Sequence, residues 1–355
     1  MVDLFAELPR LFRWRDARAA GITRHRLRQA LHTHEVHRVA HGLYQRSAAL
    51  EDGEPWQLLR GRHLERCAEL LALHPGHAAS HQTAAALHDL DLRLHPDMPV
   101  HLTAIERVPR SRRVEGVTLH HADSVRNDTV EVDGLRATTI ARTIADILRT
   151  STPPHSVAVL DGAVRDRRVT AAEVWSVLRR QVRWRGRPRA LEAFALHDPT
   201  RETWLESYSF VRFYELGLPL PLPQVEILDE GFHLVARVDG LLEETGTFLE
   251  ADGAGKYLIP VREQGLSEAE SVQLSMTLQQ QRHDRLLALG LTGARWTTTE
   301  AVQTPEAVVS RIRAAMRAGD PATFRGWLRI GGQVMSLHEA CRMRQSPTTP
   351  WRQVS

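Results

Sequence analysis

The sequence predicts a multi-domain α+β protein, and three observations lead to this fold class. The chain has 355 residues, too many for one ordinary domain, and its 42% hydrophobic content is enough for several cores. Positive charge is concentrated near the N-terminus, and helical and strand patterns alternate after it. In the last third of the chain, the predicted elements are, in order, a helix, three short strands, a long helix and a strand. We expect domains at residues 1–50, 51–190 and 191–320, with a short helix and mobile tail at 321–355.

The composition of the chain also predicts where in the cell the protein is located. No apolar run approaches the roughly 20 residues that a membrane span needs. The first residues, MVDLFAELPRLFRWR, lack the order of a signal peptide, so we expect a cytoplasmic protein without a membrane partner. The two cysteines, Cys67 and Cys341, lie far apart, and neither has a CxxC partner. We therefore expect no disulfide framework and no cysteine zinc site.

The first fifty residues carry nine arginines and four acidic residues, whereas the whole chain has a net charge of +3. A short helix is expected at about 15–20, ending at Gly21, a residue suited to a left-handed cap. Thr23 is placed to cap a second helix. Two helices joined by a glycine turn, the second one basic, form a helix-turn-helix pattern. The side chains expected to contact double-stranded DNA are Arg24, His25, Arg26 and Arg28.

The stretch VHRVAHGLYQR follows and alternates around Gly42, which predicts a small hairpin or wing. Its rim residues Arg38 and His41 would face phosphates. A small basic helical domain with solvated arginines is the alternative. The five histidines of residues 25–41 fit no familiar metal spacing, and we expect no zinc there. The segments AAGITRHRLRQAL and VHRVAHGLYQR resemble the N-terminal winged helix of the AbiEi antitoxin family, over about fifty residues.

The middle region, residues 51–190, predicts a mixed α+β block. It has an amphipathic helix at 56–73, a second helix in ASHQTAAALHDL, and strand-like pieces at 99–105, 116–122 and 128–139. Asp133-Gly134 is a hairpin signal. The segments SHQTAAALHDL and TTIARTIADIL are similar to the region that follows the winged helix in AbiEi-type proteins. This block shows no nucleophile–base pair and no phosphate loop, so scaffold, dimerisation and partner binding all stay open.

Residues 179–190, RRQVRWRGRPRA, hold six arginines and one tryptophan. A solvated linker is the plainer interpretation. The alternative is a second strip that contacts DNA phosphates.

The C-terminal region predicts a helix at about 200–216, a meander of strands at 224–229, 233–242 and 246–252, and a long helix from a Ser267/Glu270 capping box to Gly290. A strand, ARWTTT, and a helix at 305–317 complete it. This α-β-β-β-α-β order resembles the core of the PD-(D/E)xK, or restriction-endonuclease-like, fold. Residues 200–320 are similar to the branch related to very-short-patch-repair endonucleases. The resemblance implies carboxylates at Asp239, Glu250 and Asp252, with Glu206 on the first helix.

Such a grouping suits phosphodiester hydrolysis, which needs a divalent ion to polarise the phosphate and lower the pKa of a water. Mg²⁺ prefers oxygen ligands, often two carboxylates. Glu250 and Asp252 lie two apart on a strand and so face one side, and Asp239 arrives on the adjacent strand. The expected metal ligands are Asp239 and Glu250, with Mg²⁺ or Mn²⁺ as the cofactor.

Lys256, in LEADGAGKY, is the sole lysine of the chain. The position at which the superfamily carries its lysine is held by Asp252, and Lys256 lies beyond a flexible Gly-Ala-Gly turn. Because arginine fills the other basic positions, we expect a compact ammonium near the carboxylates, a role that guanidinium does not reproduce. The alternative is chance retention in a surface loop.

Two functions from different classes follow. One is a metal-dependent DNA endonuclease in a defence or toxin–antitoxin context. The other is a non-catalytic, antitoxin-like transcriptional repressor with a degenerate nuclease fold, a cognate toxin as partner and a homodimeric state.

Overall fold

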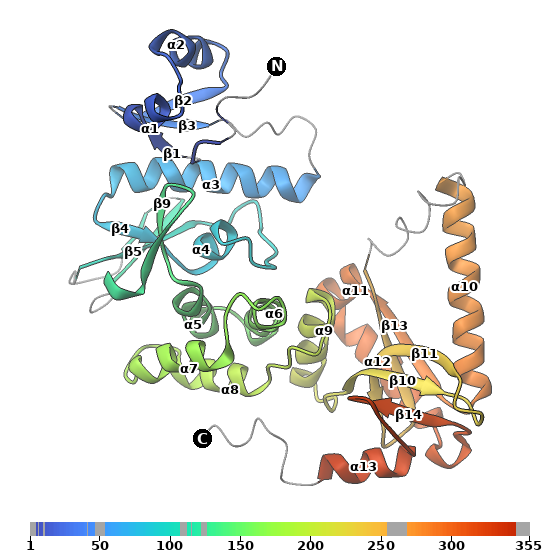
Figure 1. Cartoon of the computed structure of the whole chain (residues 1–355). Helices are drawn as coiled ribbons and strands as arrows, with labels where there is room; N and C mark the ends of the chain where they lie inside the picture. Colours follow the sequence, from blue (N-terminus) through green and yellow to red (C-terminus); the bar gives the residue numbers. More distant parts are fainter. Residues whose placement is uncertain are drawn as a thin grey trace. The chain divides into compact units, whose positions relative to one another are not determined.

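The structure is a computed structural model, and it describes residues 5, 7–9, 11–40, 42–46, 54–106, 112–114, 116–121, 126–253 and 268–345 (Figure 1). Two compact units divide the chain: Met1–Ser151 with Asp166–Ala190, and Thr152–Arg165 with Leu191–Ser355. The α+β class is confirmed, since helices and three sheets occur together. Among the described residues, no helix is both long and apolar enough to cross a membrane.

The first unit begins with two short helices and a small sheet in the order β1-β3-β2. Gly21 has φ +79°, as its expected left-handed cap requires, and the Thr23 hydroxyl accepts a hydrogen bond from the Arg26 amide at 3.2 Å. Phe12, Leu27 and Val36 lie in the buried core of this part. Its elements are β1 (Leu11–Arg13), α1 (Trp14–Ala19), α2 (Arg24–His32), β2 (Val36–Ala40) and β3 (Leu43–Arg46).

The rest of the first unit is built on a six-stranded sheet in the order β6-β7-β5-β4-β9-β8. Strands β5 and β7 run parallel, and β8 and β9 form the expected hairpin, with positive φ at Asp133 and Gly134. The helices are α3 (Pro55–Leu73), α4 (His81–Leu87), α5 (Ile140–Thr150) and α7 (Ala171–Arg180). The strands and one 3₁₀ turn are β4 (His77–Ala79), β5 (Val100–Ala104), β6 (Arg112–Val114), β7 (Val117–His120), η1 (Arg126–Asp128), β8 (Thr129–Val132) and β9 (Leu135–Thr138).

From α9 to α12 the second unit follows the order of helices and strands that the sequence predicted, with one additional short helix, α11. Its sheet runs β13-β12-β11-β10-β14-β15, and only the β12–β13 pair is parallel among the described strands of this sheet. The elements are α6 (Pro153–Arg165), α9 (Trp204–Glu215), β10 (Leu222–Leu228), β11 (Leu234–Leu242), β12 (Thr247–Asp252), α10 (Glu268–Ala288), β13 (Thr292–Thr297), α11 (Thr298–Gln303), α12 (Pro305–Ala318), η3 (Pro321–Thr323), β14 (Trp327–Ile330), β15 (Gln333–Met335) and α13 (Leu337–Gln345). Helix α8 (Arg187–Ala195) contains the boundary between the units.

Two hydrophobic clusters sandwich this sheet. Helices α9, α11 and α12 supply one cluster, which includes Phe213, Trp296 and Ile312. Helices α10 and α13 cover the other cluster, which includes Phe248 and Leu286 (Figure 1). Residues 327–345 differ from the expectation of a short helix and tail, because β14 pairs with β10 and extends the sheet. The expected capping residue Ser267 lies outside the described residues.

Two half-buried, neutral histidines, His63 and His120, make the first unit sensitive to acid. Burial lowers the pKa of His63 to about 4 and is the largest cause of a pKa of about 4 for His120. Unfolding returns both groups to about 6.5, so the unfolded chain binds more protons between these values. The contribution of each neutral ring to stability is therefore present above pH 6.5 or so and is lost as the pH falls toward about 4.

We predict that the urea midpoint of the first unit decreases between about pH 7 and pH 5. The change His63→Gln should flatten this decrease, since an amide keeps a partner for the Thr83 hydroxyl, which lies 2.9 Å from His63 Nε2. Circular dichroism at several pH values measures it. An equally steep decrease in the His63→Gln variant would contradict the assignment.

Candidate functional site

The C-terminal carboxylates predicted from the sequence converge on one cavity of the second unit. Along β12, Phe248 and Leu249 enter opposite clusters, so Glu250 shares the α10 face with Phe248. Glu250 and Asp252 line a cavity of about 300 Å³. Asp239 on β11 joins them, and its Oδ2 accepts a hydrogen bond from the Ala251 amide at 2.7 Å.

Two arginines hold the innermost carboxylate of this cluster. Glu250 is only 2% exposed, and its Oε1 contacts Arg282 of α10. Its Oε2 lies 2.6 Å from Arg295 Nη2, and Arg295 Nε lies 3.7 Å from Asp252. The contact with Arg295 is an ion pair rather than an aligned hydrogen bond, so Glu250 Oε2 has no hydrogen-bond partner among the described residues. This carboxylate is thus neutralised but incompletely solvated by protein groups.

The pKa of Glu250 is raised above its ordinary value. Burial is the largest cause, and the negative charges of Asp239 and Asp252 add to it, whereas Arg282 and Arg295 act in the opposite direction. A carboxyl with a raised pKa beside two further carboxylates is a common feature of functional sites.

Glu206 lies near this cluster but does not line its cavity. The residue is 1% exposed on α9, and it accepts hydrogen bonds from the Glu202 amide, the Thr203 hydroxyl and the Gln224 amide at 2.7–2.9 Å. Burial is the main cause of its raised pKa, and the charge of Asp239 is the second. Glu206 is therefore coupled to the cluster through Asp239.

Two of the residues expected from the sequence lie outside the described part of the chain, Lys256 and His41. Conversely, sequence reasoning missed Arg282, Arg295 and Gln279, which surround the carboxylates. Arg295 is the register partner of Glu250 across the parallel β12–β13 pair. The sequence held no signal for this pairing, because the pairing depends on how the two strands align.

Most of the α2 side chains that were predicted to contact DNA are exposed to solvent. Arg24, His25 and Arg28 are exposed, and so is Arg38 on β2. Arg26 differs: it is half-buried, forms an ion pair with Glu35 at 2.5 Å and lies over the Phe5 ring at 5.1 Å. Arg26 therefore supports the local fold, while its neighbours carry the exposed charge.

The donor set of the C-terminal cavity fits a hard divalent cation. Asp239, Glu250 and Asp252 supply carboxylate oxygens, which Mg²⁺ and Mn²⁺ prefer. Glu250 Oε2 lacks a hydrogen bond among the described residues, and a cation would relieve the repulsion from Asp239 and Asp252 that adds to the effect of burial on the pKa of Glu250. Such an ion would have to compete with Arg282 and Arg295 for the same oxygens.

Comparison with known proteins gives a partial similarity. No family model matches the chain. Two proteins of Mycobacterium tuberculosis, uncharacterized protein MT2308 of strain CDC 1551 and uncharacterized protein Rv2248 of strain H37Rv, are each 31% identical to it over 169 residues. The match covers 47% of this chain and spans 60% of the length of each relative.

We predict that Arg295→Met destabilises the protein by about 3 kcal/mol, the low end for breaking a buried ion pair, because Arg282 still contacts Glu250. Adding Glu250→Gln should restore part of this loss, because no buried charge is then left unpaired. Urea unfolding measures both.

The matched control is Arg329→Met, which removes a more exposed ion pair with Glu226 on the same sheet. Its cost should stay at or below about 1 kcal/mol. Equal losses for the two arginines would contradict the buried role of Arg295.

Proposed function

We propose that this chain is a DNA-binding protein whose C-terminal domain is a metal-dependent DNA endonuclease of the PD-(D/E)xK type, acting in a bacterial defence or toxin–antitoxin context. One observation carries the proposal: Asp239, Glu250 and Asp252 come from two adjacent strands to one cavity beneath α10. The order α-β-β-β-α-β around this cavity supports it.

The roles follow from the surroundings of each residue. Asp239 and Glu250 would hold Mg²⁺ or Mn²⁺, which supplies polarisation of the phosphate and a lowered pKa for water. Asp252 lies at the mouth beside Glu250 and supports this carboxylate pair. Glu206 acts through Asp239, as a positioning residue. Lys256, four residues after Asp252 in the sequence, would supply the cation near the attacking water.

Hydrolysis consumes one water for each phosphodiester. The water oxygen forms a bond to phosphorus, the bond to one sugar oxygen breaks, and this oxygen leaves with a proton. Arg282 lines the cavity. Once displaced from Glu250, its guanidinium would lie where a phosphate oxygen enters, and arginine matches phosphate geometry with two donors.

The second candidate is a transcriptional repressor that resembles an antitoxin and has lost catalysis. One observation favours it: Glu250 is already neutralised by Arg282 and Arg295, as expected where no cation is needed. In this case the basic helix α2 and the following hairpin form a DNA-reading winged helix, a homodimer reads the operator, and a cognate toxin is the protein partner.

A plasmid cleavage assay separates the two candidates. With Mg²⁺ or Mn²⁺ the enzyme should nick or linearise DNA, and Asp239→Asn with Glu250→Gln should reduce the rate by at least about a hundredfold, since a metal ligand set is removed. The matched control Asp284→Asn changes an exposed carboxylate of α10 and should leave the rate unchanged. Absence of cleavage by the unaltered protein, together with retained promoter binding, would support the repressor.

We predict that DNA affinity depends on α2 and on salt. Changing Arg24 and Arg28 to Gln should weaken binding by about tenfold or more and lower the salt dependence by about two counterions. Arg26→Gln should act mainly on stability, because that side chain is tied to Glu35. Gel-shift titrations at several salt concentrations measure the affinity; binding indifferent to salt and to Arg24 and Arg28 would end the winged-helix proposal.

A further inference from the structure

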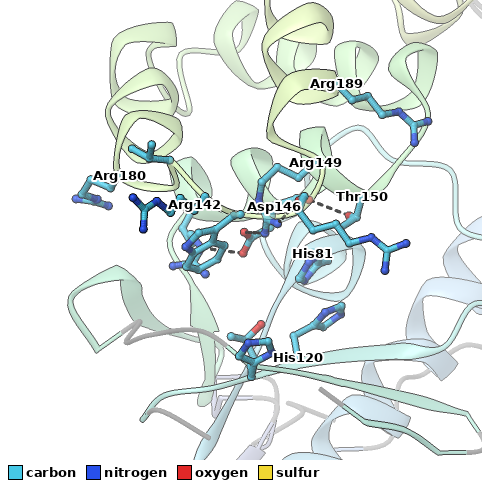
Figure 2. A pocket seen from close by; sticks show the side chains of 15 residues that line it. His81, His120, Arg142, Asp146, Arg149, Thr150, Arg180 and Arg189 are labelled. Atoms are coloured by element: carbon cyan, nitrogen blue, oxygen red, sulfur yellow. Dashed lines mark hydrogen bonds and ion pairs between the residues drawn. The ribbon is translucent and has the colours of Figure 1, made fainter. Parts of the chain in front are cut away.

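A second and larger cavity lies within the first unit. Its volume is about 1140 Å³. The ends of the parallel strands β5 and β7 border it on one side, and helix α5, the end of α7, the turn at 182–186 and the start of α8 border it on the other (Figure 2). The lining residues are His81, Thr103, His120, His121, Arg142, Asp146, Arg149, Thr150, Arg180, Val182, Arg183, Trp184, Arg185, Gly186 and Arg189.

One buried carboxylate organises the wall formed by α5. Asp146 is 1% exposed, and it accepts hydrogen bonds from Arg142 at 2.8 Å, from Arg149 at 2.6 Å and from Gln181 at 3.1 Å (Figure 2). Although burial alone raises its pKa, the guanidinium charges of Arg142 and Arg149 hold the pKa of Asp146 well below its usual range. Asp146 therefore stays ionised and fixes two guanidiniums at the cavity.

The turn at 182–186 is held against this wall by contacts of Trp184, Arg185 and Gly186. The guanidiniums of Arg142 and Arg149 each lie 4.8 Å from the Trp184 ring centroid, and Arg149 donates a hydrogen bond to the Arg185 carbonyl at 3.0 Å. Gly186 has φ +82°, and a Cβ atom there would come within 2.2 Å of the Arg149 carbonyl oxygen. The cavity is therefore a built feature of the fold, and the arginines of RRQVRWRGRPRA do not form a merely solvated linker.

The cavity carries a large excess of positive charge. Six arginines line it, whereas Asp146 is its one acidic lining residue among those described. Asp128 lies behind the wall and pairs with Arg142 at 3.1 Å and Arg180 at 2.7 Å. Even with Asp128 included, two carboxylates balance six arginines. Within the described part of the chain, the remaining cations Arg183, Arg185 and Arg189 form no ion pair, so the cavity is prepared for an anion.

Burial lowers the pKa of His81 and of His120, so these two neutral imidazoles form the opposite side of the cavity (Figure 2). His81 is 2% exposed, its Nδ1 lies 2.9 Å from the Ser80 hydroxyl, and its ring stacks on His120 with centroids 3.9 Å apart. Its Nε2 has no hydrogen-bond partner among the described residues. A buried nitrogen without a partner is costly, and a bound ligand that offers a hydroxyl or an amine would satisfy it.

We propose that this cavity binds a small phosphate-bearing molecule of nucleotide size, with its phosphates on Arg183, Arg185 and Arg189 and a hydroxyl or base edge on His81. Arginine forks match phosphate oxygens in pairs. The volume is close to that of small-molecule sites, about 300–1,000 Å³, and is too small to enclose a DNA duplex. The volume therefore favours a soluble nucleotide over a DNA duplex as the ligand.

A metal ion is the competing occupant of the histidine side. His81, His101 and His120 each offer a nitrogen within 4.8 Å of the others. However, His101 Nδ1 and His120 Nε2 lie 2.9 Å apart in a hydrogen bond to each other, and the rings of His81 and His120 are stacked with their planes 18° apart. These nitrogens and rings are thus already engaged with one another. The surrounding guanidiniums also repel a cation. These observations favour the anion.

The test is isothermal titration calorimetry of the full chain with inorganic pyrophosphate and with ADP as probes. Both should bind, and the double change Arg183→Gln with Arg185→Gln should weaken each by about tenfold or more, since each charge-assisted hydrogen bond contributes about that factor. The control Arg62→Gln removes an exposed arginine of α3 outside the cavity and should change nothing. If the double variant fails to fold, Arg189→Gln alone replaces it.

Three outcomes would overturn the proposal. The first is that pyrophosphate and ADP fail to bind while a short DNA single strand or duplex binds and loses affinity in the double variant. The second is that Zn²⁺ alone binds and neither probe does. The third is that both probes bind the double variant as tightly as the unaltered protein. The result is independent of the nuclease proposal, because Asp239→Asn should leave ADP binding unchanged.

Discussion

The need to compensate buried carboxylates shapes both units of this protein. Removing an ionised carboxylate from water costs several kcal/mol unless cations and donors replace the solvent. Asp146 meets this constraint through Arg142 and Arg149, and Asp161 meets it through Arg201 at 3.0 Å. Glu250 meets it through Arg282 and Arg295. Arginine serves in every case, as its planar fork allows two directed contacts with one carboxylate.

Asp146 and Glu250 differ in how completely their charges are compensated. Asp146 receives several aligned hydrogen bonds, so its pKa lies below the usual range although burial opposes this. Glu250 has two cations nearby but an oxygen without a hydrogen bond, and its pKa is raised. A buried carboxylate whose oxygens all accept hydrogen bonds, such as Asp146, stabilises the fold around it. An unsatisfied one, with Asp239 and Asp252 beside it, retains the capacity to gain from a further positive partner.

The sequence predicted the elements of this fold better than their contacts. Gly21, Thr23 and the Asp133-Gly134 turn act through local backbone geometry, and so their roles were readable from a few neighbouring residues. The shared face of Glu250 and Asp252 followed from the two-residue period of a strand. The pairing of Glu250 with Arg295 was not readable, since it depends on the register between β12 and β13. Residues 327–335 were missed as strands because each run is very short and adds to the sheet edge beyond β10.

The arginines around residue 185 show why composition alone did not decide between a linker and a site. Six like charges in twelve residues are ordinarily a solvated segment, and the sequence contains no local reason to expect otherwise. The reason lies about forty residues earlier, where Asp146 fixes Arg149, whose side chain bonds the Arg185 carbonyl. A buried charge on one helix thereby determines the path of a distant basic turn. The unpaired cations of that turn then become wall groups of a cavity, and their mutual repulsion is relieved when an anion enters.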